Sequence, residues 1–84
     1  MFRVTRYAAD GCSDAPRVLG TAPTLSAARR LVRTALGLRR LSPTRHYVPS
    51  PDVSPVAVEG WNVRPPSHSS GWGCPVIEIE QVAP

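Results

Sequence analysis

Residues of the types that bind zinc are spread along the whole chain, at Cys12, His46, His68 and Cys74. Structural zinc sites usually take their ligands in close pairs, about two to five residues apart, and no two of these residues lie that close. We therefore expect no metal site. No export signal precedes the first cysteine, which favours a reducing cytoplasm and two free thiols, although pairing of Cys12 with Cys74 stays open.

Residues 67–70 are three serines and one histidine, close to Cys74, and these residue types can form nucleophile–base pairs. A preorganised site also needs a group that orients the base, and a loop sequence supplies none. The chain has no nucleophile elbow, phosphate-binding loop or dinucleotide fingerprint. Glu78 and Glu80 share one face of a predicted strand, which we place outward, where carboxylates are ordinarily solvated. The sequence predicts a binding protein without a cofactor, and not an enzyme.

Positive charge is concentrated in the middle of the chain. All basic side chains are arginine, the net charge is +4, and seven arginines but no acidic residue lie between Asp14 and Asp52. This asymmetry predicts a basic side that favours an acidic partner. The absence of lysine is also typical of a GC-rich genome, so the forked geometry of arginine need not have been selected.

Four arginines fall on one flank of a predicted helix, namely Arg29, Arg30, Arg33 and Arg40. Arginines spaced by about one turn can contact the phosphates of a nucleic-acid backbone, either DNA or RNA. The alternative is the solvated face of an amphipathic helix, because charge runs on a helix often only solvate it. No aromatic residue accompanies them for stacking on bases.

Trp72 stands between two glycines in a predicted loop, where it does not fit a regular core layer. An exposed tryptophan is typical of an anchor for a protein partner. We assign Trp72, with Tyr47 and His68, to a protein-binding surface. The alternative is that the loop folds back and the ring covers a thin core.

The elements that must position these residues follow from periodicity. Strands are predicted at 2–9 and 17–21 from alternation and a turn between them. An apolar stripe from Leu25 to Leu36 predicts a helix that Thr24 caps and that ends at Gly37 or before Pro43. Residues 42–55 hold four prolines and are predicted to be an extended connection.

The second half predicts a strand at 56–64, with a bulge at Gly60 and Trp61 in the core, and a strand at 75–82 with Ile77 and Ile79 inward. With 84 residues and no apolar run that could span a membrane, the chain is one domain. The expected architecture is α+β, in the order ββαββ, with one amphipathic helix packed on one face of an antiparallel sheet. Its parts are 2–41, the connection 42–55 and the hairpin 56–82.

The first half of the chain has a recognisable form: an alternating strand, Asp10-Gly11, a short strand, and the helix entry Thr24-Leu25-Ser26-Ala27-Ala28-Arg29-Arg30-Leu31-Val32. It resembles the small orphan accessory proteins of high-GC actinobacterial phages and their hosts. The resemblance covers about half the chain and transfers no functional residue. It implies binding to a host macromolecule, often to inhibit or redirect it. Our first expectation is therefore a cytoplasmic accessory factor that binds a host protein and modulates it. The alternatives are a nucleic-acid-binding module and a homo-oligomer that pairs through the edge strand 17–21.

Overall fold

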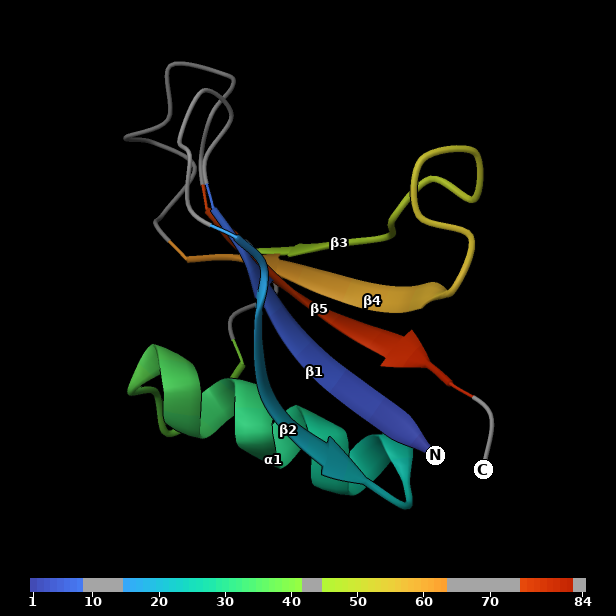
Figure 1. Cartoon of the computed structure of the whole chain (residues 1–84). Coiled ribbons are helices and arrows are strands. Elements are labelled where there is room, and N and C mark those ends of the chain that lie inside the picture. The colour runs from blue at the N-terminus through green and yellow to red at the C-terminus, as the bar shows by residue number, and fades with distance from the viewer. Residues whose placement is uncertain (9–14, 42–44, 64–74, 83–84) are drawn as a thin grey trace.

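The chain folds into one sheet and one helix (Figure 1). Apolar and polar residues alternate in the first and last strands, and the apolar residues between them follow a helical period. The computed structural model describes residues 1–8, 15–41, 45–63 and 75–82. Its elements are β1 (Phe2–Tyr7), β2 (Arg17–Ala22), α1 (Leu25–Leu36), β3 (His46–Tyr47), β4 (Ala57–Asn62) and β5 (Val76–Gln81). The predicted α+β class is confirmed. The predicted order ββαββ is wrong by one strand, because the order is ββαβββ.

The five strands form one antiparallel sheet in the order β2-β1-β5-β4-β3. Both predicted hairpins, β1–β2 and β4–β5, are present. They are joined at the centre, where β5 pairs with β1 along its whole length, from Phe2 opposite Gln81 to Tyr7 opposite Val76. The first and last strands therefore lie side by side in the middle of the sheet (Figure 1).

Helix α1 begins and ends as the sequence predicts. The side chain of Thr24 accepts a hydrogen bond from the backbone N–H of Ala27 at 3.1 Å. Gly37 has φ 69°, a left-handed conformation that glycine adopts without strain, and its N–H and the next one satisfy the last carbonyls. The helix contacts β2, β1 and β5 on one face of the sheet, so the opposite face has no helix among the described residues.

The core lies between this helix and the sheet. Its side chains from the strands include Val4, Trp61 and both inward isoleucines of β5, and the helix contributes Ala28 and Val32. The prediction that Trp61, Ile77 and Ile79 are core residues is confirmed.

Two local predictions need correction. The connection 42–55 contains a short edge strand, β3, because His46 and Tyr47 pair with Trp61 and Gly60. The bulge predicted at Gly60 lies elsewhere, since the register of β4 with β5 shifts between Ala57 and Glu59. Of the other predicted residues, Cys12, His68, Trp72 and Cys74 lie outside the described residues.

Candidate functional site

One row of residues crosses four strands on the face of the sheet opposite the helix, which we call the open face. Thr5 is opposite Glu78, Glu78 is opposite Gly60, and Gly60 is opposite Tyr47. Residues directly opposite each other in an antiparallel sheet project from the same face. Because the neighbouring residues Val4 and Ile79 are in the core, this row points away from the helix.

Tyr47 lies across Gly60 and reaches Glu78. Its hydroxyl donates a hydrogen bond to Oε2 of Glu78 at 2.5 Å. A Cβ atom added at Gly60 would lie 2.7 Å from both Cε1 and the hydroxyl oxygen of Tyr47. Glycine at position 60 therefore provides the clearance that lets the tyrosine cross β4. Tyr47, predicted to bind a partner, has its hydroxyl engaged within the sheet.

A second group of hydrogen bonds surrounds Glu80. Arg3 Nε donates at 3.0 Å and Thr5 Oγ1 at 2.6 Å to Oε1, and the Tyr7 hydroxyl donates to Oε2. Burial alone would raise the pKa of Glu80, but these hydrogen bonds outweigh burial and hold the pKa below its ordinary value. Glu80 is therefore an ionised carboxylate at neutral pH.

Both tyrosines of the open face are hydrogen-bond donors at neutral pH. Burial and the hydrogen bond to Glu80 raise the pKa of Tyr7 from 10.0 to about 12. Burial and the hydrogen bond to Glu78 raise the pKa of Tyr47 far above its ordinary value. Neither hydroxyl is suited to act as a general base under these conditions.

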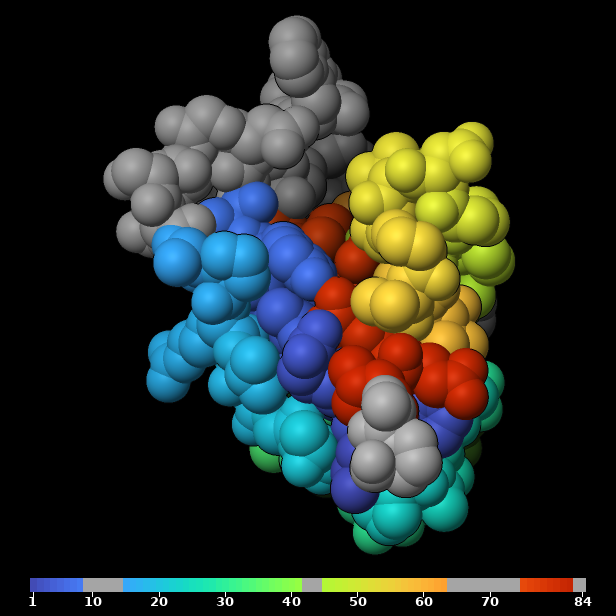
Figure 2. Space-filling model, turned by 45° about the vertical axis from the view of Figure 1, so that its right-hand side comes forward, coloured from blue at the N-terminus to red at the C-terminus, as the bar shows by residue number. Residues whose placement is uncertain are grey.

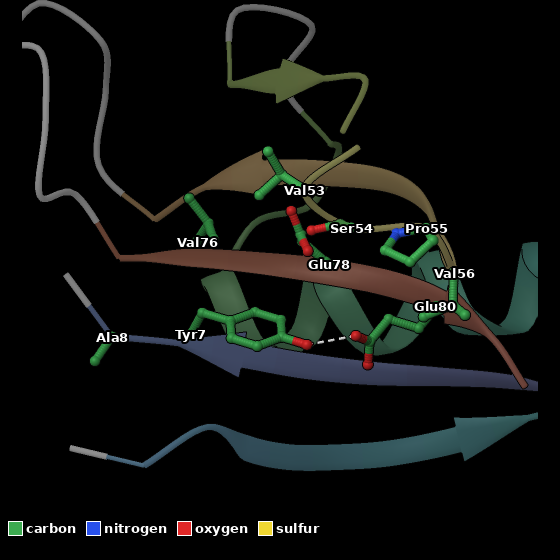
Figure 3. A pocket seen from close by; sticks show the side chains of 9 residues that line it. All are labelled: Tyr7, Ala8, Val53, Ser54, Pro55, Val56, Val76, Glu78 and Glu80. Atoms are coloured by element: carbon green, nitrogen blue, oxygen red, sulfur yellow. Dashed lines mark hydrogen bonds between the residues drawn. The ribbon is translucent and has the colours of Figure 1, made fainter. Parts of the chain in front are cut away.

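Tyr7 and the two glutamates border a hollow of about 550 Å³, which we call the carboxylate hollow (Figure 3). It is lined by Tyr7, Ala8, Val53, Ser54, Pro55, Val56, Val76, Glu78 and Glu80. Figure 3 shows Tyr7 pointing along β1 towards Glu80, and the 53–55 segment facing the two glutamates from the other side. In Figure 2 the surface of residues 48–56 (yellow) stands beside that of β5 (red).

The outward placement of the two glutamates on β5 is correct, but the prediction that water solvates them is wrong. Glu78 is 6% exposed and Glu80 is 4% exposed. The side chains of Tyr7 and Tyr47, together with the 53–56 segment, cover them. They are the functional candidates that the sequence interpretation missed.

The four arginines predicted for the alternative function come together at a second hollow, of about 320 Å³. It is lined by Ser26, Arg29, Arg30, Arg33, Arg40 and Leu41, and we call it the arginine hollow. Four of the six lining residues lie on α1. The other two, Arg40 and Leu41, follow the end of the helix at Gly37 and line the same hollow.

Glu59 of β4 fixes one of these arginines. Its Oε1 accepts hydrogen bonds from Nε of Arg29 at 2.8 Å and from Nη2 at 2.5 Å. Its Oε2 lies 3.1 Å from Nε2 of His46. Within the described ranges, no carboxylate lies within 4.0 Å of the guanidinium groups of Arg30, Arg33 or Arg40. Three guanidiniums at the hollow thus have no carboxylate partner in the part of the chain that the structure describes.

Neither a cluster of metal ligands nor a membrane-spanning helix occurs in the part of the chain that the structure describes. No cluster of three or more His, Cys, Asp or Glu side chains that could hold a metal occurs there, and His46 is engaged with Glu59 and the edge of Trp61. No helix among these residues has the length and apolar character needed to cross a membrane.

Compared with protein-family models, curated proteins and solved structures, the chain matches none. Its function is therefore inferred from its own residues.

Proposed function

We propose that the protein binds nucleic acid by holding backbone phosphates at the arginine hollow. The observation that supports this function is the convergence of four guanidinium groups on one concave surface, three of them without a carboxylate partner among the described residues. Guanidinium groups bind phosphate oxygens through paired hydrogen bonds, and they remain charged at every physiological pH.

The lining of the arginine hollow favours contact with the phosphate backbone of the nucleic acid and not with its bases. It contains guanidinium groups, one serine and one leucine, and no aromatic ring on which a base could stack. Phosphate contacts carry no sequence information. The proposed binding is therefore weakly dependent on sequence and strongly dependent on salt.

The proposed function involves no chemical step. The lining residues offer hydrogen-bond donors and positive charge, but no general base next to a nucleophile. Arg29, which Glu59 holds in place, gives the hollow one arginine with a fixed orientation. This lowers the ordering cost of binding at that position.

The function predicted first, modulation of a host protein through Trp72 and His68, stays a prediction because both residues lie outside the described ones. Tyr47, the third residue of that surface, is hydrogen-bonded to Glu78. Self-association through the edge strand β2 also stays a prediction, as do the phage context and the cytoplasmic location.

The experiment is a salt titration of binding to fluorescently labelled DNA and RNA, followed by anisotropy. Wild type is compared with the double variant Arg30→Ala/Arg33→Ala. The matched control is Arg6→Ala/Arg17→Ala, which removes the same charge from two exposed, directly paired positions of β1 and β2. Each phosphate contact that is lost lowers the logarithmic salt slope by about 0.7–0.9.

We expect the slope to fall by about 1.4–1.8 in the hollow variant, for two lost contacts, and to stay unchanged in the control. Equal losses in both variants would mean that only net charge matters. That result, or no binding by wild type at low salt, would overturn the proposal.

A further inference from the structure

Among the described residues, no cation lies beside the buried carboxylate of Glu78. It is 6% exposed, and among the described residues its hydrogen-bond donor is the Tyr47 hydroxyl, which occupies Oε2. Within the same residues, no arginine or histidine nitrogen lies within 4.0 Å of it. Glu80, by contrast, has the guanidinium of Arg3 at 3.0 Å. A buried carboxylate without a counter-charge is costly, and a cation placed against it removes that cost.

Glu78 also faces space that a ligand can occupy. It lines the carboxylate hollow, whose volume of about 550 Å³ is within the range of small-molecule sites. The lining of the hollow thus contains two carboxylates, and of these Glu80 is hydrogen-bonded to the guanidinium of Arg3.

The rim of the hollow is apolar and exposed. Val53 is 82% exposed and Val56 is 46% exposed, and both line the hollow together with Pro55 and Val76. Exposed valines around a buried charge favour a ligand that has both a charged head and an apolar chain. Figure 3 shows this arrangement, with Val53 and Pro55 on the side of the hollow opposite Tyr7.

From these observations we infer that the carboxylate hollow binds a small molecule with a primary ammonium or guanidinium group on a short aliphatic chain. The cationic head lies against Glu78, and the Ser54 hydroxyl is the neighbouring polar group of the lining. The chain lies along Val53 and Val56. This site is on the face of the sheet opposite α1, so it does not depend on the function proposed for the arginine hollow.

Calorimetric titration with three probes tests the inference. The probes are n-butylguanidinium, n-butylammonium and n-butylurea, which is the neutral counterpart of the first with nearly the same shape. Each is titrated into wild type and into two variants. Glu78→Gln removes the charge but keeps an oxygen that accepts from Tyr47. Glu59→Gln is the matched control, a carboxylate of β4 that interacts with Arg29 on the helix side.

We expect both cations to bind wild type and the urea to bind at least about tenfold more weakly, since a lost charge-assisted hydrogen bond changes affinity by about that factor. Glu78→Gln should lower the affinity for both cations by a similar factor and leave the affinity for the urea unchanged. Glu59→Gln should leave all three unchanged. Equal binding of the urea and the guanidinium, equal losses in the two variants, or no binding of the cations would overturn the inference.

A further variant tests the inference independently, in case Glu78→Gln does not fold. Val53→Ser changes an exposed rim residue, so the fold is expected to be unaffected. This substitution should lower the affinity for all three probes by a similar factor, because it removes contact with the butyl chain that they share. If Val53→Ser leaves the affinities unchanged, the chain does not lie along this rim and the inference is wrong.

Discussion

Replacing Gly60 by alanine tests whether Tyr47 reaches Glu78 by crossing β4. The added Cβ would lie 2.7 Å from the hydroxyl oxygen of Tyr47. This distance is shorter than the 3.0 Å below which Cβ atoms essentially never approach another heavy atom. The backbone of β4 is held on both sides, by β3 and by β5. The tyrosine belongs to a two-residue edge strand, so its side chain is the part that moves.

The size of the effect follows from the bond that this movement breaks. A hydrogen bond to a charged group contributes about 1.5–3 kcal/mol to stability. Alanine in place of glycine returns about 0.5–1 kcal/mol, because it restricts the unfolded chain more. Gly60→Ala should therefore lower the free energy of unfolding by about 1–2 kcal/mol. Urea unfolding followed by circular dichroism measures this change.

The same substitution in a Tyr47→Ala background isolates the cause. With no ring to displace, Gly60→Ala should be neutral or should stabilise the protein by up to about 1 kcal/mol. If the loss of stability is as large without the tyrosine as with it, the clash lies elsewhere on β4. The explanation of Gly60 as clearance for Tyr47 would then be refuted.

Two further predictions concern stability. Thr24→Ala removes the helix cap, which costs about 1 kcal/mol of stability, so the melting temperature should fall by about 4–8 °C. The control Ser26→Ala, at an exposed helical position, should not lower the melting temperature. Equal losses in the two variants would contradict the role of the cap. Because the pKa of Glu80 in the folded protein is below its ordinary value of 4.5, its stabilising effect is complete above that pH and is lost as the pH falls through the folded pKa. The difference in unfolding free energy between wild type and Glu80→Gln should therefore shrink as the pH falls below about 4.5. A difference that grows on acidification would contradict the ionised assignment.

Local signals were sufficient to predict the helix and its two ends. Thr24 and Gly37 act on backbone groups within one turn, so their chemistry can be read without the rest of the fold. The alternation in β5 also predicted the correct inward residues, Ile77 and Ile79. Strand β3 carries no such signal, because two residues have no period, and it forms by pairing with β4.

The carboxylate hollow could not be predicted, because its parts come from both ends and the middle of the chain. Thr5 and Glu80 are hydrogen-bonded across a sequence separation of 75 residues. Each strand alone shows a polar row that looks solvated, and the burial of Glu80 appears only when β1 and β5 pair. A polar row on one strand that complements a charged row on another is the signal that such pairing leaves in a sequence.

The arginine hollow was predicted in part. Helical spacing placed Arg29, Arg30 and Arg33 on one flank, and Arg40 with them, and all four line the hollow. The role of Glu59 was missed, because it reaches Arg29 from β4, which lies 30 residues further along the chain. Its contact with His46 depends on β3 as well.

The most direct test of the central claim is an NMR titration that observes the arginine Nε–Hε resonances while a short unlabelled DNA duplex is added. The account predicts that the resonances of Arg30, Arg33 and Arg40 shift together and saturate. Those of Arg6 and Arg17, on β1 and β2, should stay in place. Shifts of equal size at Arg6 and Arg17, or no shift at the arginine hollow when the duplex is bound, would contradict the account.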